Sequence, residues 1–166
     1  MNNPKIKITV TDFGTMTAEL YPDKAPETVA NFIKLANQGF FNGLIFHRVI
    51  RGFMIQGGGF TPDFEQKHTA SIKGEFIANG FMSNDLRHTR GVLSMARTSA
   101  PNSASSQFFI MHMDAPHLDG AYAGFGKIVE GIEIVDMIAG VKTGSYGWYE
   151  DVPRTAVVIE SIEVIE

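Results

Sequence analysis

The chain has 166 residues, with 14 Lys and Arg against 18 Asp and Glu, for a formal net charge of −4. This length suits one ordinary domain, and 44% apolar residues with 19% charged residues argue against disorder. The absence of cysteine excludes a disulfide scaffold, a thiolate nucleophile and a Cys-ligated metal. The acidic balance argues against binding to nucleic acid by phosphate neutralisation.

The start of the chain predicts neither a leader nor a membrane anchor. Residues 1–5 run directly into an alternating segment, with no apolar stretch of the kind found in signal peptides. No run approaches the roughly 18 apolar residues that a membrane-spanning helix needs. We therefore expect a cytoplasmic protein without membrane contact, forming a single domain over residues 1–166.

The predicted elements begin with a β-hairpin followed by a helix. Residues 5–11 and 15–20 each alternate, which places on one face Ile6, Ile8, Val10, Met16, Ala18 and Leu20. Pro26 can occupy the first position of a helix that Gly39 ends in the left-handed conformation. Its apolar stripe is Val29, Phe32, Ile33 and Ala36.

The rest of the chain predicts short strands and one further helix. Strands are expected over 44–50, 53–57, 92–96, 107–112, about 122–129 and 155–165, and a short helix over 131–139 with Gly140 as its stop. Residues 60–90 have the composition of an irregular excursion, and 140–153 that of a connection. The sum predicts a mainly β domain in which eight antiparallel strands close into a barrel, capped by two helices.

Common catalytic motifs are missing from the sequence. It has no nucleophile elbow, no phosphate-binding loop and no zinc-protease helix motif. The glycines at 57–59 and 124–126 are typical of bulges and turns in a curved sheet. We therefore expect neither a cofactor nor a metal.

Two apolar segments carry unexpected polar residues. In Phe46–Gly58 an Arg and a Gln flank large apolar residues, and in Ser105–Ile110 a Gln comes two residues before a Phe. Residues i and i+2 of a strand share a face. If the faces of these strands converge, they form an apolar floor with Phe53 at its edge. Three hydrogen-bond donors then stand beside this floor. The floor would be Met54 and Phe109, and the donors Arg48, Gln56 and Gln107. The alternative is that the apolar residues are ordinary core and Arg48 pairs with a carboxylate.

These residues closely resemble the signature of the cyclophilin family of peptidyl-prolyl cis–trans isomerases. The run FHRVIRGFMIQGG matches the family's first block, and further blocks match at Leu93–Arg97 with Pro101–Ile110, at His117–Gly120 with Phe125–Ile128, and at the first helix. The likeness is greatest to the single-domain bacterial members. It implies an eight-stranded antiparallel barrel capped by two helices, and isomerisation of X–Pro bonds.

The resemblance also implies roles for individual residues. Arg48 matches the catalytic arginine, and the pocket for the proline ring matches Phe53, Met54, Phe109 and Leu118. Gln56 and Gln107 match glutamines around the substrate backbone, while Ala96 and Arg97 fall where the family contacts the peptide through its main chain. Arg97 stands where the family usually has Asn. Tyr122 stands where many members have His, and His117 where many have Trp. Tyr122 and His117 are both expected to contact substrate.

Partners follow from the same resemblance. We expect proline-containing peptides and unfolded or folding proteins as substrates, no cofactor, no metal, and a monomer. The family's Trp contributes to binding of cyclosporin, so His117 predicts weakened cyclosporin binding. His47, beside the catalytic position, is expected to be a hydrogen-bonded structural residue.

Two other functions remain open at this point. The same pocket can serve a binding module that holds Pro-containing segments without turnover, although a binder has no need of a cation at the proline nitrogen. A carrier barrel for a small molecule needs a hollow interior, whereas the many Phe, Ile and Met residues on inward faces predict a filled one.

Overall fold

The computed structural model describes residues 3–165, which form one eight-stranded sheet, one separate two-stranded sheet and two α-helices. The helices are α1 (Pro26–Asn37) and α2 (Ile132–Ala139), with 3₁₀ turns η1 (Ile77–Asn79) and η2 (Pro116–Leu118). The strands are β1 (Lys5–Val10), β2 (Gly14–Leu20), β3 (Arg48–Ile50), β4 (Met54–Gly57), β5 (Val92–Met95), β6 (Phe108–Met111), β7 (Gly124–Glu130), β8 (Thr143–Tyr146), β9 (Tyr149–Pro153) and β10 (Ile159–Val164). No helix within residues 3–165 has the length and apolar character needed to cross a membrane.

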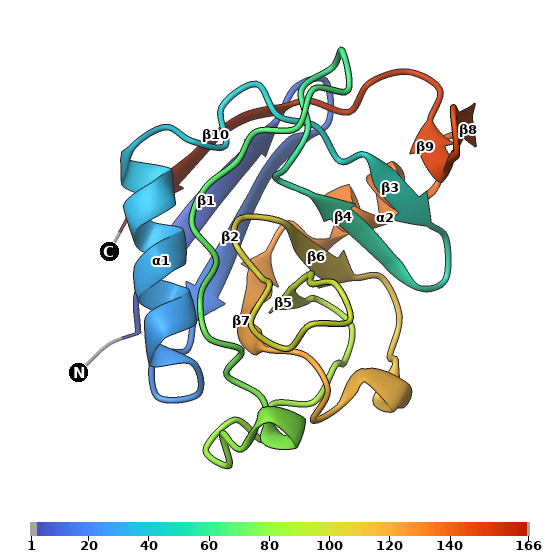
Figure 1. The fold of residues 1–166 in the computed structure, drawn as a ribbon. Coiled ribbons are helices and arrows are strands. Elements are labelled where there is room, and N and C mark those ends of the chain that lie inside the picture. Colours follow the sequence, from blue (N-terminus) through green and yellow to red (C-terminus); the bar gives the residue numbers. More distant parts are fainter. Residues whose placement is uncertain (1–2, 166) are drawn as a thin grey trace.

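The sheet is an open half-barrel, so the predicted closed barrel is wrong. Its eight strands follow the order β10-β1-β2-β7-β5-β6-β4-β3, which leaves β10 and β3 as edges (Figure 1). The strand expected over 44–50 is regular only from Arg48. The segment before it contacts the β10 side through the isolated bridge Ile45 to Val158 and through backbone hydrogen bonds to Val157 and Ile159, without forming a continuous ladder. The mainly β class with two helices is confirmed.

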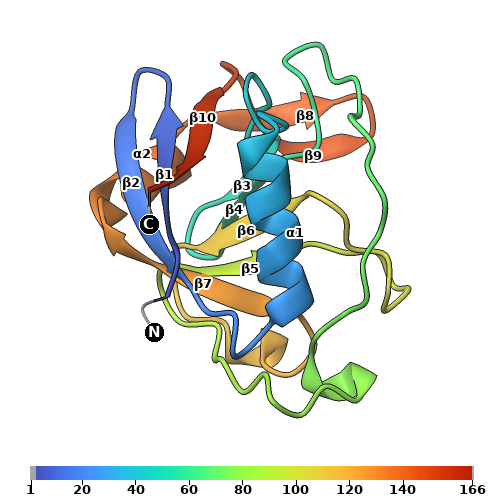
Figure 2. The same cartoon turned by 90° about the vertical axis from the view of Figure 1, so that its left-hand side faces the viewer.

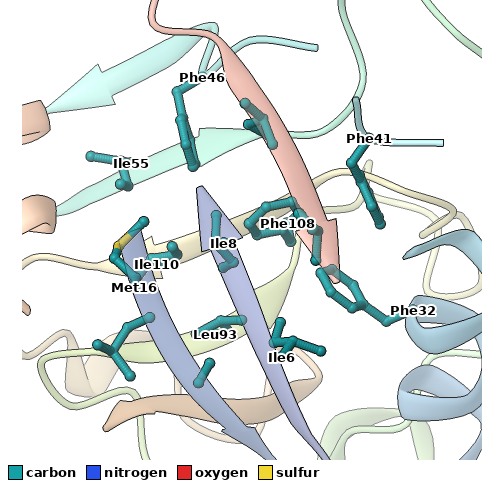
Figure 3. Close-up of a cluster of buried hydrophobic side chains, with 14 of the residues drawn as sticks. Ile6, Ile8, Met16, Phe32, Phe41, Phe46, Ile55, Leu93, Phe108 and Ile110 are labelled. Atoms are coloured by element: carbon teal, nitrogen blue, oxygen red, sulfur yellow. The ribbon is translucent and has the colours of Figure 1, made fainter. Parts of the chain in front are cut away.

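Strand alternation divides the buried residues into two groups on opposite faces of the sheet. The main core collects Ile55 of β4 and Phe108 and Ile110 of β6, and Phe32 of α1 packs against Phe108 with ring centroids 5.3 Å apart (Figure 3). The opposite face carries a smaller cluster made of Met54, Val92, Phe109, Met111, Ala115 and Leu118. The strands β4 and β6 are therefore buried on both faces, and the smaller cluster supports the candidate site.

The irregular segment between β4 and β5 provides the cap of α1. The helix starts at Pro26 as predicted, but it has no side-chain cap of its own. Instead, the buried carboxylate of Glu75 accepts hydrogen bonds from the backbone N–H groups of Glu27 and Thr28 and from the Thr28 hydroxyl, at 3.2, 2.7 and 2.7 Å. A carboxylate placed there satisfies orphan donors and complements the helix dipole.

The connection expected over 140–153 contains the hairpin β8–β9, which sequence patterning missed. The hairpin lies beside β3 at the end of the sheet away from the chain termini (Figures 1 and 2). Its aromatic rings pack on Phe60 and Phe64 of the long excursion, with Phe64 stacked on Tyr146 at 4.5 Å and Phe60 against Tyr149 at 5.6 Å. These tertiary contacts stabilise a pair of strands that would be marginal alone.

We predict that Glu75→Gln lowers the free energy of unfolding by about 1–3 kcal/mol. The donors at the start of α1 now meet two carboxylate oxygens, and in the variant one of these oxygens is replaced by an NH₂ group, which cannot accept a hydrogen bond. The measurement is chemical denaturation followed by circular dichroism. The matched control Glu65→Gln, at an exposed position of the same excursion, should stay within about 0.5 kcal/mol of the unmodified chain. Equal stability of the two variants would contradict the capping role.

Candidate active site

Three side chains from neighbouring strands form a row on the face opposite the main core. Arg48 on β3 pairs with Gln56 on β4, and Gln56 pairs with Phe109 on β6. Directly paired residues of an antiparallel sheet project to the same side. Met54 shares this face with Gln56 because it lies two residues earlier. The register thus brings together the cation, the amide and the apolar floor that the sequence placed on separate strands.

These residues line a pocket of about 130 Å³. Nine of the eleven candidate residues form its wall: Arg48, Phe53, Met54, Gln56, Ala96, Arg97, Phe109, Leu118 and Tyr122. Gln107 lies outside this wall in an adjoining hollow. His117 is exposed and does not line the pocket, but its ring lies 5.8 Å from that of Phe53. The floor is largely shielded from solvent, since Met54, Phe109 and Leu118 are each at most 7% exposed.

A chain of side-chain hydrogen bonds orients the polar rim. Arg48 Nη1 donates to Gln56 Oε1 at 3.3 Å, and Gln56 Nε2 donates to Gln107 Oε1 at 3.1 Å. The Gln107 side chain packs directly over Gly59, at a place that a Cβ atom would occupy. The absence of a side chain at Gly59 therefore lets Gln107 approach the backbone closely beside the site. The guanidinium of Arg48 is oriented by a neutral partner, Gln56.

The Arg97 side chain supports one wall of the pocket. Its guanidinium lies 4.7 Å from the ring centroids of both Phe76 and Tyr122, between the two, and its Nη2 donates to the carbonyl oxygen of Ala121 at 2.7 Å. Cation–π contacts of this kind hold an aromatic ring in place. The Arg97 side chain, which stands in place of the Asn expected here, thus helps to fix the position of Tyr122.

A buried histidine that no sequence motif singles out, His88, lies against Phe109. The rings of His88 and Phe109 stack with centroids 6.0 Å apart, and His88 Nε2 lies 2.8 Å from Ser94 Oγ. Burial lowers the pKa of His88, and the hydrogen bond with Asp119 opposes that shift. The neutral ring supports the floor from behind without adding charge.

The turn between β3 and β4 is anchored by a second histidine. The backbone N–H of Gly52 donates to His112 Nδ1 at 2.9 Å, which leaves Nε2 to carry the proton and donate to Asp136 Oδ1 at 3.1 Å. Arg90 forms a two-pronged ion pair with the same carboxylate and holds the pKa of Asp136 below its usual range. This network ties the hairpin that carries Arg48 to α2.

His47 differs from its expectation as a hydrogen-bonded residue. It is 5% exposed, and its Nδ1 has no hydrogen-bond partner within the part of the chain that the structure describes. The ring instead packs against Phe60 with centroids 4.6 Å apart. Burial, together with the positive charge of Arg48, lowers the pKa of His47 to about 4.

The composition of the pocket limits the chemistry it can perform. Its wall has two guanidinium groups, those of Arg48 and Arg97, one amide and apolar or aromatic side chains, with no carboxylate, hydroxyl of Ser or Thr, or imidazole among the lining residues. Among residues 3–165 no three His, Asp or Glu side chains gather as a metal site would require. The arrangement suits binding and polarisation of a largely apolar group rather than covalent catalysis.

Comparisons with known proteins now decide the family. The family model described as cyclophilin type peptidyl-prolyl cis-trans isomerase matches residues 5–164. The chain belongs to the cyclophilin family. It is 47% identical to peptidyl-prolyl cis-trans isomerase B of Escherichia coli over 165 residues, covering 94% of this chain and 97% of that protein. A Streptomyces antibioticus peptidyl-prolyl cis-trans isomerase is 45% identical, with 93% and 95% of the two chains covered.

Solved structures agree with this assignment. A cyclophilin type isomerase of Cryptosporidium parvum superposes with a TM-score of 0.82 and 28% identity, covering 99% of this chain and 98% of that one. A second structure of it, in the presence of the dipeptide Ala-Pro, has a TM-score of 0.81, 30% identity and coverage of 98% and 99%. The resemblance read from the sequence is confirmed, and the chain is a peptidyl-prolyl cis–trans isomerase.

We predict that His47 makes the cyclophilin less stable at acid pH. Between the ordinary histidine pKa of 6.5 and about 4, the unfolded chain binds a proton here that the folded chain does not. The free energy of unfolding should therefore fall as the pH falls through this window, by about 3 kcal/mol in total from this residue. Urea denaturation at several pH values measures the slope.

In the variant His47→Gln the free energy of unfolding should fall less steeply as the pH is lowered. Part of the fall that remains is due to His88, whose pKa is also lowered by burial. His68→Gln, at an exposed position, is the matched control and should keep the full slope. An unchanged slope in His47→Gln would rule out His47 as a source of the acid sensitivity.

Proposed function

We propose that Arg48 lowers the barrier to X–Pro rotation by meeting the nitrogen of the twisted amide. Rotation about the C–N bond faces a barrier of about 18–20 kcal/mol because conjugation is lost at its top. The nitrogen then becomes pyramidal and carries a localised lone pair. A guanidinium aimed at that nitrogen finds an acceptor only in the twisted state, which is the condition for catalysis rather than binding alone.

The placement of Arg48 beside the apolar floor carries this proposal. Arg48 lines the pocket, and Gln56, its direct neighbour across the strands, accepts its hydrogen bond. No carboxylate among residues 3–165 pairs with Arg48, so its charge is available to a ligand. A binding module would gain nothing from a cation held at this position.

The apolar pocket supports the reaction in two ways. A proline ring held on Met54, Phe109 and Leu118, with Phe53 at the edge, stays fixed while the acyl side turns. The same surfaces exclude the water that stabilises the polar, planar amide. Gln56 and Gln107 would orient Arg48 and the flanking carbonyl, and the main chain at Ala96 and Arg97 would meet the peptide backbone.

The substrates that fit this site are proline-containing peptides and unfolded or folding proteins. The pocket volume of about 130 Å³ suits a small ring, and the rim is open to a chain on either side. The related Cryptosporidium structure was solved in the presence of Ala-Pro, which is the smallest ligand of this class. No cofactor takes part in the proposed mechanism.

We predict that Arg48→Ala lowers kcat/KM for an Ala-Pro peptide by about 10²–10³, the effect of removing one preorganised donor. Arg48→Lys should restore little, because an ammonium lacks the planar fork that Gln56 orients. Exchange spectroscopy by NMR reads cis–trans interconversion directly. Arg51→Ala, an exposed arginine of the same hairpin, is the matched control and should keep its rate. Full activity of Arg48→Ala would overturn the mechanism.

Binding of cyclosporin should be weakened by His117. Its ring contacts Phe53 but does not line the pocket, so it offers a bound macrocycle less apolar surface than an indole at this position would. We predict that His117→Trp raises cyclosporin affinity by about tenfold, the order of one added aromatic contact. Titration calorimetry measures both proteins, with exposed His68→Trp as control. Equal affinity of the His117→Trp variant and the unmodified chain would contradict the prediction.

A further inference from the structure

A second hollow opens on the other side of Arg48, against the hairpin β8–β9. It measures about 360 Å³ and is lined by His47, Arg48, Trp148, Tyr149, Glu150 and Asp151. The proline pocket, by comparison, measures about 130 Å³. Arg48 lines both hollows, so the two adjoin at this residue. β9 packs beside β3, as both views of the fold show (Figures 1 and 2).

The hairpin presents one side chain that the fold itself does not use. Tyr146 and Tyr149 are held by rings of the excursion, and His47 joins the same cluster through Phe60. Trp148, in the turn between the two strands, is 91% exposed and has no ring partner among residues 3–165. An exposed indole on a turn whose flanking tyrosines are packed is typical of a residue that contributes to binding a partner.

The charge around this hollow is negative despite Arg48. Glu150 and Asp151 both line it, and within the described residues neither forms an ion pair. His47 adds no positive charge near neutral pH, and its buried Nδ1 lacks a hydrogen-bond partner in residues 3–165. Two carboxylates and one guanidinium thus leave an excess of negative charge beside a free indole face.

We propose that this second hollow is a substrate subsite for a Lys or Arg side chain close to the proline in sequence. The proposal rests on the function proposed for Arg48, and it adds a specificity to the same reaction. An ammonium or guanidinium placed over Trp148 gains a cation–π contact while Glu150 and Asp151 neutralise it. An acidic side chain at the same place meets two like charges. The hairpin is then a specificity-determining element that selects basic sequences around X–Pro bonds.

The test scans one charged residue along a fixed proline peptide. Peptides with a central Ala-Pro and a single Lys, Glu or Ala at each of three positions on either side are compared by NMR exchange spectroscopy. We expect Lys at one position or two adjacent positions on one side to raise kcat/KM about threefold to tenfold over Ala, and Glu to lower it. The preference should shrink between low salt and 0.5 M salt, since exposed charges are screened.

Variants of the hairpin β8–β9 test whether the preference for Lys arises in this hollow. The double variant Glu150→Gln with Asp151→Asn should bring the Lys-to-Ala ratio of kcat/KM close to one, and Trp148→Ala should lower it about twofold or more. Asn suits position 151 because that residue has φ of 60° and Asn tolerates the left-handed region. The double variant Glu160→Gln with Glu163→Gln removes the same charge from the exposed side of β10 and should keep the ratio.

Two results would overturn the subsite. One is a Lys-to-Ala ratio near one at all six positions, and the other is a preference that survives in the Glu150→Gln, Asp151→Asn variant. Failure of the proposed catalytic role would look different. In that case Arg48→Ala would retain full activity on the uncharged peptide, whatever the response to Lys.

Discussion

The whole site depends on two strands, β4 and β6, that are buried on both faces. Ile55, Phe108 and Ile110 fill the main core, while Met54 and Phe109, one residue out of phase, form the floor of the pocket. The alternation of a strand has a period of two, so a slip of one residue would exchange the two sets. The packing that stabilises the fold therefore also fixes the pocket.

Arg48 has less support from the sheet, because it lies on the edge strand β3. Three contacts from outside the sheet compensate for the missing neighbour. Gly52 at the tip of the β3–β4 hairpin is bound to His112, His47 packs into the aromatic cluster, and β9 lies along β3. An edge strand held in this way keeps a cation in place while leaving one side of it open to a chain.

The sequence predicted most of the sheet because alternation is a local property. The first hairpin, α1 with Pro26 at its start, and the shared face of Gln107 and Phe109 all follow from spacing within one segment. What it missed involves residues far apart in the chain. The capping of α1 by Glu75, the packing of Tyr146 on Phe64 and the open edge at β3 depend on tertiary contacts that no local pattern encodes.

The electrostatics of the site explain why Arg48 is bonded to a neutral amide rather than to a carboxylate. A carboxylate in place of Gln56 would hold Arg48 more firmly. It would also neutralise the positive charge that, in the proposed mechanism, acts on the amide nitrogen of the substrate. Burial and the charge of Arg48 lower the pKa of the adjacent His47, so this neighbour adds no second positive charge beside Arg48 near neutral pH. The acidic residues of β9 line the second hollow, which Arg48 shares, and they form no ion pair with it in residues 3–165. Charge is thus arranged so that Arg48 is oriented by an amide and remains free to act on a ligand.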